Sequence, residues 1–258
     1  MVALAGLIVS LWWLGTPGGL AGKADAIGYA ICHQIAERSF DVHGHPLPLC
    51  ARCTGMYLGV MIGAAVLVAG KRGQAALFAP RRVLVALGLF VGIMGLDGIN
   101  SYLHLFPGYV GPYEPTNWLR LITGSLTGLA MILILLPAFN ATVWARPARR
   151  PVVAGLGELA GLVIVIGLVD ALVLTRDPVA LTILGSISIL GPVLLLGLVW
   201  AILYLSLTRR ENTLHRLAEL WLPAIAGLGL TFLMLGAIAL IRFKLTGTWD
   251  GFDLNQFR

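Results

Sequence analysis

Residues 179–207 read VALTILGSISILGPVLLLGLVWAILYLSL, and this stretch decides the fold because it contains no charged side chain. A helix that crosses the hydrocarbon core of a bilayer needs about 20 predominantly apolar residues, so the stretch predicts a membrane span. Of the 258 residues, 58% are hydrophobic and only 12% are charged, whereas a soluble domain carries about 25% charged residues. The composition therefore excludes a soluble enzyme, a disordered protein and a secreted disulfide scaffold.

Other apolar segments have the length of a span: Val2–Leu20, Thr54–Gly70, Val83–Tyr102, Asn117–Phe139, Val152–Thr175 and Leu220–Phe243. The first is the weakest, because the run GTPGG at residues 15–19 interrupts it. No basic residue precedes it and no clear cleavage site follows it, which favours a retained helix over a signal peptide. We predict an all-α, polytopic transmembrane helix bundle with about seven spans, or six if the first segment does not cross.

The basic residues indicate how the spans are oriented. Ten of the eighteen fall in three alternate loops: Lys71, Arg72, Arg81, Arg82, Arg146, Arg149, Arg150, Arg209, Arg210 and Arg216. Loops rich in Lys and Arg stay on the cytoplasmic side of a membrane. This predicts a cytoplasmic N-terminus, with residues 21–53 and the C-terminal tail outside the plasma membrane. The net charge of +6 then requires no nucleic-acid partner.

Glycines spaced by four residues recur in the second, third and fourth segments: Gly55, Gly59 and Gly63, then Gly88 and Gly92, then Gly124 and Gly128. Such stripes let helix backbones approach closely in lipid. They predict that these three spans pack as one tight bundle.

All three cysteines lie in one segment, residues 31–55, ICHQIAERSFDVHGHPLPLCARCTG. We expect a short helix over Asp25–Arg38 and a loop over Asp41–Leu49, broken by glycine and prolines. A Cys-x-x-Cys pair either holds half of a metal site or cycles between dithiol and disulfide.

An odd number of cysteines favours the metal, because three thiolates and one imidazole form a complete Cys3His zinc site. The candidate ligands are Cys32, Cys50, Cys53 and His33, with His43 or His45 as alternatives for the histidine. Zinc is the favoured metal. A closed structural site is the usual form, and a metal used in chemistry and a thiol redox pair remain open.

A second group of polar residues lies at the predicted outer ends of the third and fourth spans. Asp97, Asn100 and Ser101 share one helix face, and Asn117 and Arg120 begin the next span. We expect Asp97 to pair with Arg120, either as a lock between two helices or in a polar pocket. The candidate catalytic residues are Asp97, Asn100, Asn117 and Arg120, with Arg120 suited to an anionic head group or carboxylate.

The motifs CHQ, ERSF and PLPLCARCTG, with the later TNWLRLITG, resemble the signature of a domain-of-unknown-function family of bacterial and archaeal multi-pass membrane proteins. The resemblance covers residues 24–128. It implies a membrane location, and it marks these positions: Cys32, His33, Cys50, Arg52, Cys53, Asp97, Asn117 and Arg120. It implies no activity. We expect residues 1–140 to form the family-like half with the outer Cys/His segment (21–53) and the pocket, and residues 141–258 to add further transmembrane helices.

Several functions fit this pattern. The first is a metal-dependent membrane enzyme acting on a lipid-linked or apolar substrate. The others are a structural or accessory subunit of a membrane complex and a quinone-coupled thiol–disulfide oxidoreductase. A transporter is a weaker alternative, resting on the acids Glu158 and Asp170. The expected partners are the lipid bilayer, partner subunits of a membrane complex, and a lipid-like or anionic ligand.

Overall fold

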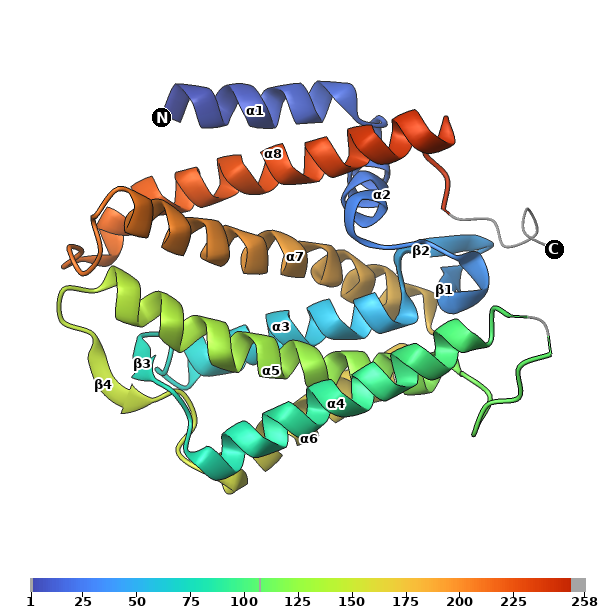
Figure 1. The fold of residues 1–258 in the computed structure, drawn as a ribbon, viewed down its shortest axis with the longest axis horizontal. Coiled ribbons are helices and arrows are strands. Elements are labelled where there is room, and N and C mark those ends of the chain that lie inside the picture. Colours follow the sequence, from blue (N-terminus) through green and yellow to red (C-terminus); the bar gives the residue numbers. More distant parts are fainter. Residues whose placement is uncertain (1, 107, 252–258) are drawn as a thin grey trace.

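The computed structural model describes residues 2–106 and 108–251, and it is a helical bundle (Figure 1). Within these residues, six helices are long and apolar enough to cross a membrane. They are α3 (Ala51–Ala69), α4 (Arg81–Leu103), α5 (Asn117–Val143), α6 (Leu156–Leu174), α7 (Pro178–Leu207) and α8 (Trp221–Thr246). The predicted all-α polytopic fold is confirmed. The predicted C-terminal tail beyond Gly251 lies outside the described residues.

The first apolar segment does not form one straight span. Its residues form α1 (Val2–Gly15) and the start of α2 (Gly19–Ile31), and these two helices meet at an angle of 105°. At 1.5 Å per residue, the 14 residues of α1 fall short of a hydrocarbon core about 30 Å thick. Helix α1 lies along α8, and only α1 and α2 together would make a seventh span (Figure 1).

The bend is fixed by a buried lysine. The Nζ of Lys23 donates to the carbonyl oxygens of Trp13 and Thr16 and, at 2.9 Å, to the hydroxyl of Thr16. The ammonium group therefore binds carbonyls at the end of α1 that have no partner within the helix.

The tightest contact in the bundle is between α3 and α5. A Cβ atom added to any of four glycines would overlap a backbone oxygen of the facing helix: Gly55 against Leu121, Gly59 against Ser125, Gly124 against Arg52, and Gly128 against Met56. The predicted glycine packing of these two spans is confirmed. For α4 it is wrong, because no other group lies within 4 Å of a Cβ at Gly88 or Gly92 among the described residues. The stripe on α4 faces outward, and α4 packs on α5 through other residues.

The three basic loops meet at one end of the bundle, which we call the basic end. Strand β3 (Ala75–Leu77) pairs in parallel with β4 (Ala148–Pro151), and Trp144 bridges to Leu214. The side chain of Asn140 donates to the carbonyls of Gly73 and Ala75, both at 2.9 Å. These contacts join the loops that follow α3, α5 and α7.

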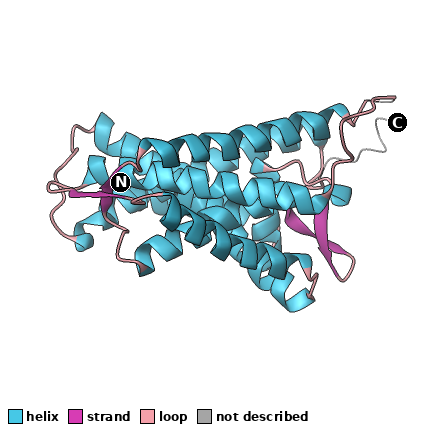
Figure 2. Cartoon of the chain, turned by 90° about the horizontal axis from the view of Figure 1, so that it is seen from below, coloured by secondary structure: helices cyan, strands magenta, loops and turns pink. Residues whose placement is uncertain are grey.

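The opposite end, which we call the cysteine end, carries α2, a 3-10 turn η1 (Ala36–Arg38) and the strands β1 (Ser39–Val42) and β2 (His45–Cys50). Figure 2 shows strands at both ends of the bundle. The helix predicted over Asp25–Arg38 is confirmed only as far as Ile31, where α2 ends. Beyond it, Cys32 is extended (φ −132°) and Gln34 is left-handed (φ 53°).

The predicted loop over Asp41–Leu49 is wrong, because most of it is an antiparallel hairpin. Val42 pairs with His45, so His43 and Gly44 form a two-residue turn. Both have positive φ, 52° and 85°, as a type I′ turn requires. The carboxylate of Asp41 accepts from the N–H of Gly44 at 2.8 Å and stabilises the turn. The hairpin leads directly into α3 through Cys50.

Candidate functional site: a cysteine cluster beside an arginine-rich pocket

The three cysteines come together although they belong to different elements. Cys32 follows α2, Cys50 ends β2 and is the N-cap of α3, and Cys53 lies in the first turn of α3. Their three Sγ atoms lie within 4.8 Å of one another. Cys32 and Cys50 are buried, and Cys53 is half-buried. No disulfide joins them. Three sulfur atoms at this spacing can hold one metal ion.

The sulfur of Cys32 is surrounded by donors. It accepts the backbone N–H groups of Cys50 at 3.3 Å and of Gln34 at 3.5 Å. Hydrogen bonds from the thiols of Cys50 and then Cys53 lower the pKa of Cys32 far below its ordinary value, because hydrogen bonds to the charged form favour that form. The site therefore favours a thiolate at Cys32, the form in which cysteine binds a metal.

An arginine of α8 holds the cysteine segment in place. One terminal nitrogen of Arg242 donates to the carbonyl oxygens of Tyr29 at 2.7 Å and Cys32 at 2.6 Å. Its guanidinium lies 4.0 Å above the ring of Tyr29. Arg242 was not predicted, although an ionisable residue within an apolar span usually has a specific partner.

The histidines take other positions. His33 is half-buried, and its Nδ1 accepts the N–H of Ile35 at 3.0 Å. His43 and His45 are exposed at the hairpin turn. Among the described residues, the sulfur cluster includes no histidine, aspartate or glutamate. The structure therefore brings the three predicted cysteines together without any of the predicted imidazole ligands.

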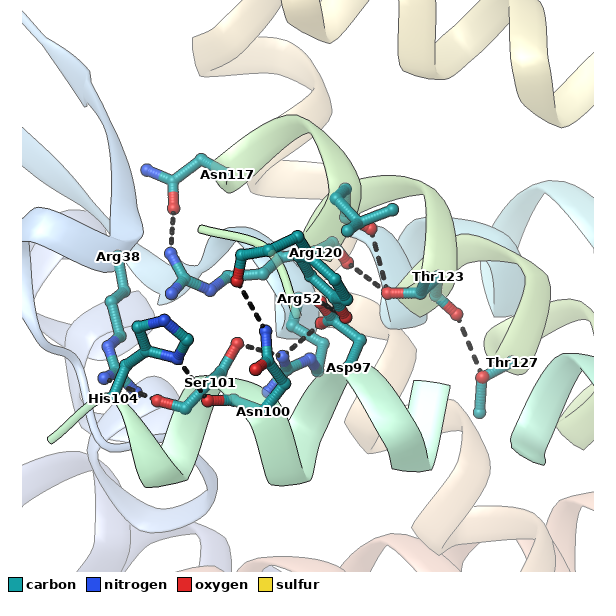
Figure 3. Close-up of polar contacts among 12 residues, drawn as sticks. Arg38, Arg52, Asp97, Asn100, Ser101, His104, Asn117, Arg120, Thr123 and Thr127 are labelled. Carbon is teal, nitrogen blue, oxygen red and sulfur yellow. Dashed lines mark hydrogen bonds and ion pairs between the residues drawn. The ribbon is translucent and has the colours of Figure 1, made fainter. Parts of the chain in front are cut away.

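Beside the cysteines, buried polar side chains of α4 and α5 lie together in the region predicted as a polar pocket (Figure 3). Asp97 is 1% exposed, and it forms an ion pair with Arg52 and accepts from the hydroxyl of Tyr113 at 3.1 Å. Arg52 also donates to Ser101 at 3.1 Å. The predicted ion pair between Asp97 and Arg120 is wrong, because Arg52 from the first turn of α3 occupies the carboxylate instead.

The other predicted pocket residues bind neighbouring segments of the cysteine end. Asn100 donates to the carbonyl of Tyr113 at 2.9 Å, and Asn117 donates to the carbonyl of Glu37 at 3.2 Å. Arg120 donates to the side-chain oxygen of Asn117 at 2.8 Å. Arg38, which was not among the predicted site residues, donates to the carbonyl of Ser101 at 3.1 Å. Tyr113 was not predicted, because nothing in its loop indicated that it folds back over Asp97.

Positive charge exceeds negative charge in this pocket. Arg38, Arg52 and Arg120 lie close enough to influence one another, and Asp97 is the buried carboxylate among them. Burial and then the neighbouring Arg52 lower the pKa of Arg38. Burial also lowers the pKa of His33, and the charges of these arginines act on it in the same direction. These groups therefore carry a net positive charge.

The two other acids of the predicted spans lie apart from this site and from each other. Asp170 is buried in α6 and accepts from Ser125 at 2.7 Å. Glu158 forms an ion pair with Arg72 at the basic end. Each acid has a separate partner near opposite ends of α6.

The comparisons with known proteins cover the part of the chain that carries this site. The family described as "Predicted membrane protein (DUF2085)" matches residues 32–134, a segment that begins at Cys32 and includes α3, α4 and the pocket.

An uncharacterized protein of Methanocaldococcus jannaschii is 31% identical over 121 residues, which cover 47% of this chain and 71% of that protein. An uncharacterized protein of Methanothermobacter thermautotrophicus is 34% identical over 106 residues, which cover 40% of this chain and 83% of that protein. No solved structure matches the chain. This chain belongs to the DUF2085 family of predicted membrane proteins.

Proposed function

We propose that Cys32, Cys50 and Cys53 bind one thiophilic metal ion, with zinc favoured. The observation that carries the proposal is the mutual approach of the three Sγ atoms within 4.8 Å. Zinc takes thiolate ligands in tetrahedral sites, and the donors around Cys32 stabilise the thiolate that such a site needs. An odd number of cysteines also leaves one thiol without a disulfide partner, and a shared metal removes that problem.

We further propose that the fourth ligand of this metal comes from outside the protein. His43 and His45 are exposed at the hairpin turn, and the Nδ1 of His33 is engaged with the N–H of Ile35. Zinc sites with three protein ligands and one open position are typical of enzymes. Bound zinc supplies Lewis-acid chemistry and activates water. Asp97, Arg52 and Arg120 would then bind and orient a polar substrate beside the metal.

The cysteine end is proposed to face the outside of the plasma membrane. The support is the gathering of the Lys and Arg loops at the opposite end, since such loops remain in the cytoplasm. Gly44→Cys and Gly73→Cys variants, compared with the parent chain in intact cells, test this orientation. We expect an impermeant thiol reagent to add label only to Gly44→Cys. Label added only to Gly73→Cys would reverse the orientation.

Metal analysis combined with free-thiol counting on the purified protein tests the metal centre. We expect one equivalent of zinc and three protected thiols. Each of Cys32→Ser, Cys50→Ser and Cys53→Ser should lose the metal, because the remaining ligands lack the geometry that the ion prefers. His43→Ala and His45→Ala are matched controls and should retain it. Loss of metal in a hairpin histidine variant would restore that residue as a ligand. Full metal content in Cys32→Ser would end the three-thiolate site.

A thiol–disulfide oxidoreductase is the second candidate. Cys50 is the N-cap of α3 and Cys53 lies in its first turn, and such a Cys-x-x-Cys pair can cycle between dithiol and disulfide. This candidate predicts a disulfide between Cys50 and Cys53 that forms and disappears with the redox state of added quinone. It also predicts protein purified without metal. Mass spectrometry of the protein under both conditions separates the two candidates.

A further inference from the structure

A pocket of about 370 Å³ opens at the beginning of α5. The pocket is lined by Thr116, the N-cap of α5, and by Asn117 and Arg120 in the first turn of that helix. Arg176 lines it from the turn after α6. Phe40 and Trp118 add apolar wall. The first N–H groups of a helix have no partner within the helix, so this pocket lies at a naturally electropositive site.

Two buried donors in the pocket lack partners. Arg120 is 7% exposed, and its Nε makes no hydrogen bond to the described residues. Thr116 stands at the N-cap of α5, yet its side chain caps nothing, and its buried hydroxyl oxygen is also without a partner in the part of the chain described. Natural proteins pair nearly all buried polar groups, so these two groups indicate a ligand.

The charges indicate the sign of that ligand. Arg120 lies near Arg38 and Arg52, whereas the carboxylate of Asp97 is taken by Arg52. A zinc ion with three thiolates would add one negative charge, which still leaves these groups net positive. Glu37 also lines the pocket, but its side chain is exposed. The positive charge of Arg176, which lines the same pocket, balances the negative charge of Glu37.

We propose that this pocket binds a phosphate group, held by the guanidinium of Arg120, the hydroxyl of Thr116 and the first N–H groups of α5. The arginine fork matches phosphate oxygens, and phosphate binds readily at helix N-termini. The phosphate belongs either to a lipid head group or to a small soluble molecule. The site goes beyond the proposed metal centre, and it does not require the metal.

Two binding assays on the full chain test the site. The first measures binding of inorganic phosphate, and the second measures capture of phosphatidylglycerol from nanodiscs that also contain phosphatidylcholine. We expect Arg120→Gln to weaken binding about tenfold or more, because a hydrogen-bonded charged group contributes that much. Arg210→Gln makes the same charge change in an exposed loop at the basic end and should leave binding unchanged. Arg176→Gln, on the exposed rim of the pocket, should weaken binding by a smaller factor and serves if Arg120→Gln does not fold.

The outcomes separate the sources of the phosphate. Phosphate binding without lipid selection identifies a soluble ligand, and lipid selection without phosphate binding identifies a head group. Both support the site, provided that the Arg120 or Arg176 variant weakens the signal. The proposal is overturned if neither probe binds, or if Arg210→Gln weakens binding as much as the pocket variants do.

Discussion

The two ends of the bundle use most of their arginines differently. At the basic end, Arg81, Arg82, Arg146 and Arg209 are exposed, Arg72 alone of these loops pairs with an acid, Glu158, among the described residues, and the loops are joined by backbone pairing of β3 with β4. At the cysteine end, Arg120 is buried, and Arg38, Arg52 and Arg242 are partly buried and bind carbonyls, a carboxylate or a hydroxyl. The exposed arginines of the basic end follow the topology rule, whereas the arginines of the cysteine end bind other groups of the candidate site. Counting charges along a sequence detects only the arginines of the basic end.

The largest difference between the ends should appear when one ion pair is broken at each. We expect Arg52→Met to destabilise the protein by about 3–5 kcal/mol, since it leaves Asp97 charged and buried. Arg72→Met breaks the pair with Glu158, whose side chain is 43% exposed, and should cost about 1 kcal/mol or less. Unfolding free energies in mixed micelles measure both. Equal losses would show that the buried pair has no special role.

The arginine that holds Cys32 should have an intermediate effect. Arg242→Gln removes the donor to the carbonyls of Tyr29 and Cys32 and should cost about 1–3 kcal/mol. It should also weaken metal retention against a chelator, because the Cys32 segment loses its anchor. Lys244→Gln, on an exposed position of the same helix, is the control. Unchanged metal retention in Arg242→Gln would mean that the sulfur cluster does not depend on α8.

The smallest effect should come from the hairpin turn. Gly44→Ala places a side chain at φ 85° and should cost about 1 kcal/mol, confined to the strands β1 and β2. Faster hydrogen exchange in this hairpin, with metal content unchanged, is the expected signature. Gly73→Ala, at the basic end and outside the left-handed region, should leave exchange in the hairpin unaffected. A loss of metal in Gly44→Ala would contradict this expectation, because it would mean that the metal site depends on the tip of the hairpin.

The spans were predictable because a bilayer imposes its requirement on every window of about 20 residues. The hairpin was not, because Pro46 and Pro48 in its second strand read as loop signals. Prolines are tolerated on a strand that has a free edge, as in this two-stranded sheet. Local patterns could not show that edge.

The sulfur cluster was predictable from the spacing of its cysteines, whereas the partner of Asp97 was not. Arg52 and Arg120 both begin a span at the same depth, so the sequence offers two equivalent cations. Which of the two arginines pairs with Asp97 depends on how α3 is oriented relative to α4 and α5, and that orientation is a property of tertiary packing. Likewise, the glycine stripe of α4 has the same spacing as those of α3 and α5, and only packing distinguishes them.

The glycine crossing of α3 and α5 also determines which part of the site is able to move. Gly124 of α5 lies directly against the backbone oxygen of Arg52. Arg52 lies in the sequence between the two ligand candidates Cys50 and Cys53. Two of the three sulfur atoms and the partner of Asp97 therefore belong to the most closely packed contact of the bundle. Cys32 is carried by an extended segment outside that crossing. Any opening of the site during ligand exchange should be a hinge movement of the Cys32 segment, while α3 and α5 remain the fixed frame.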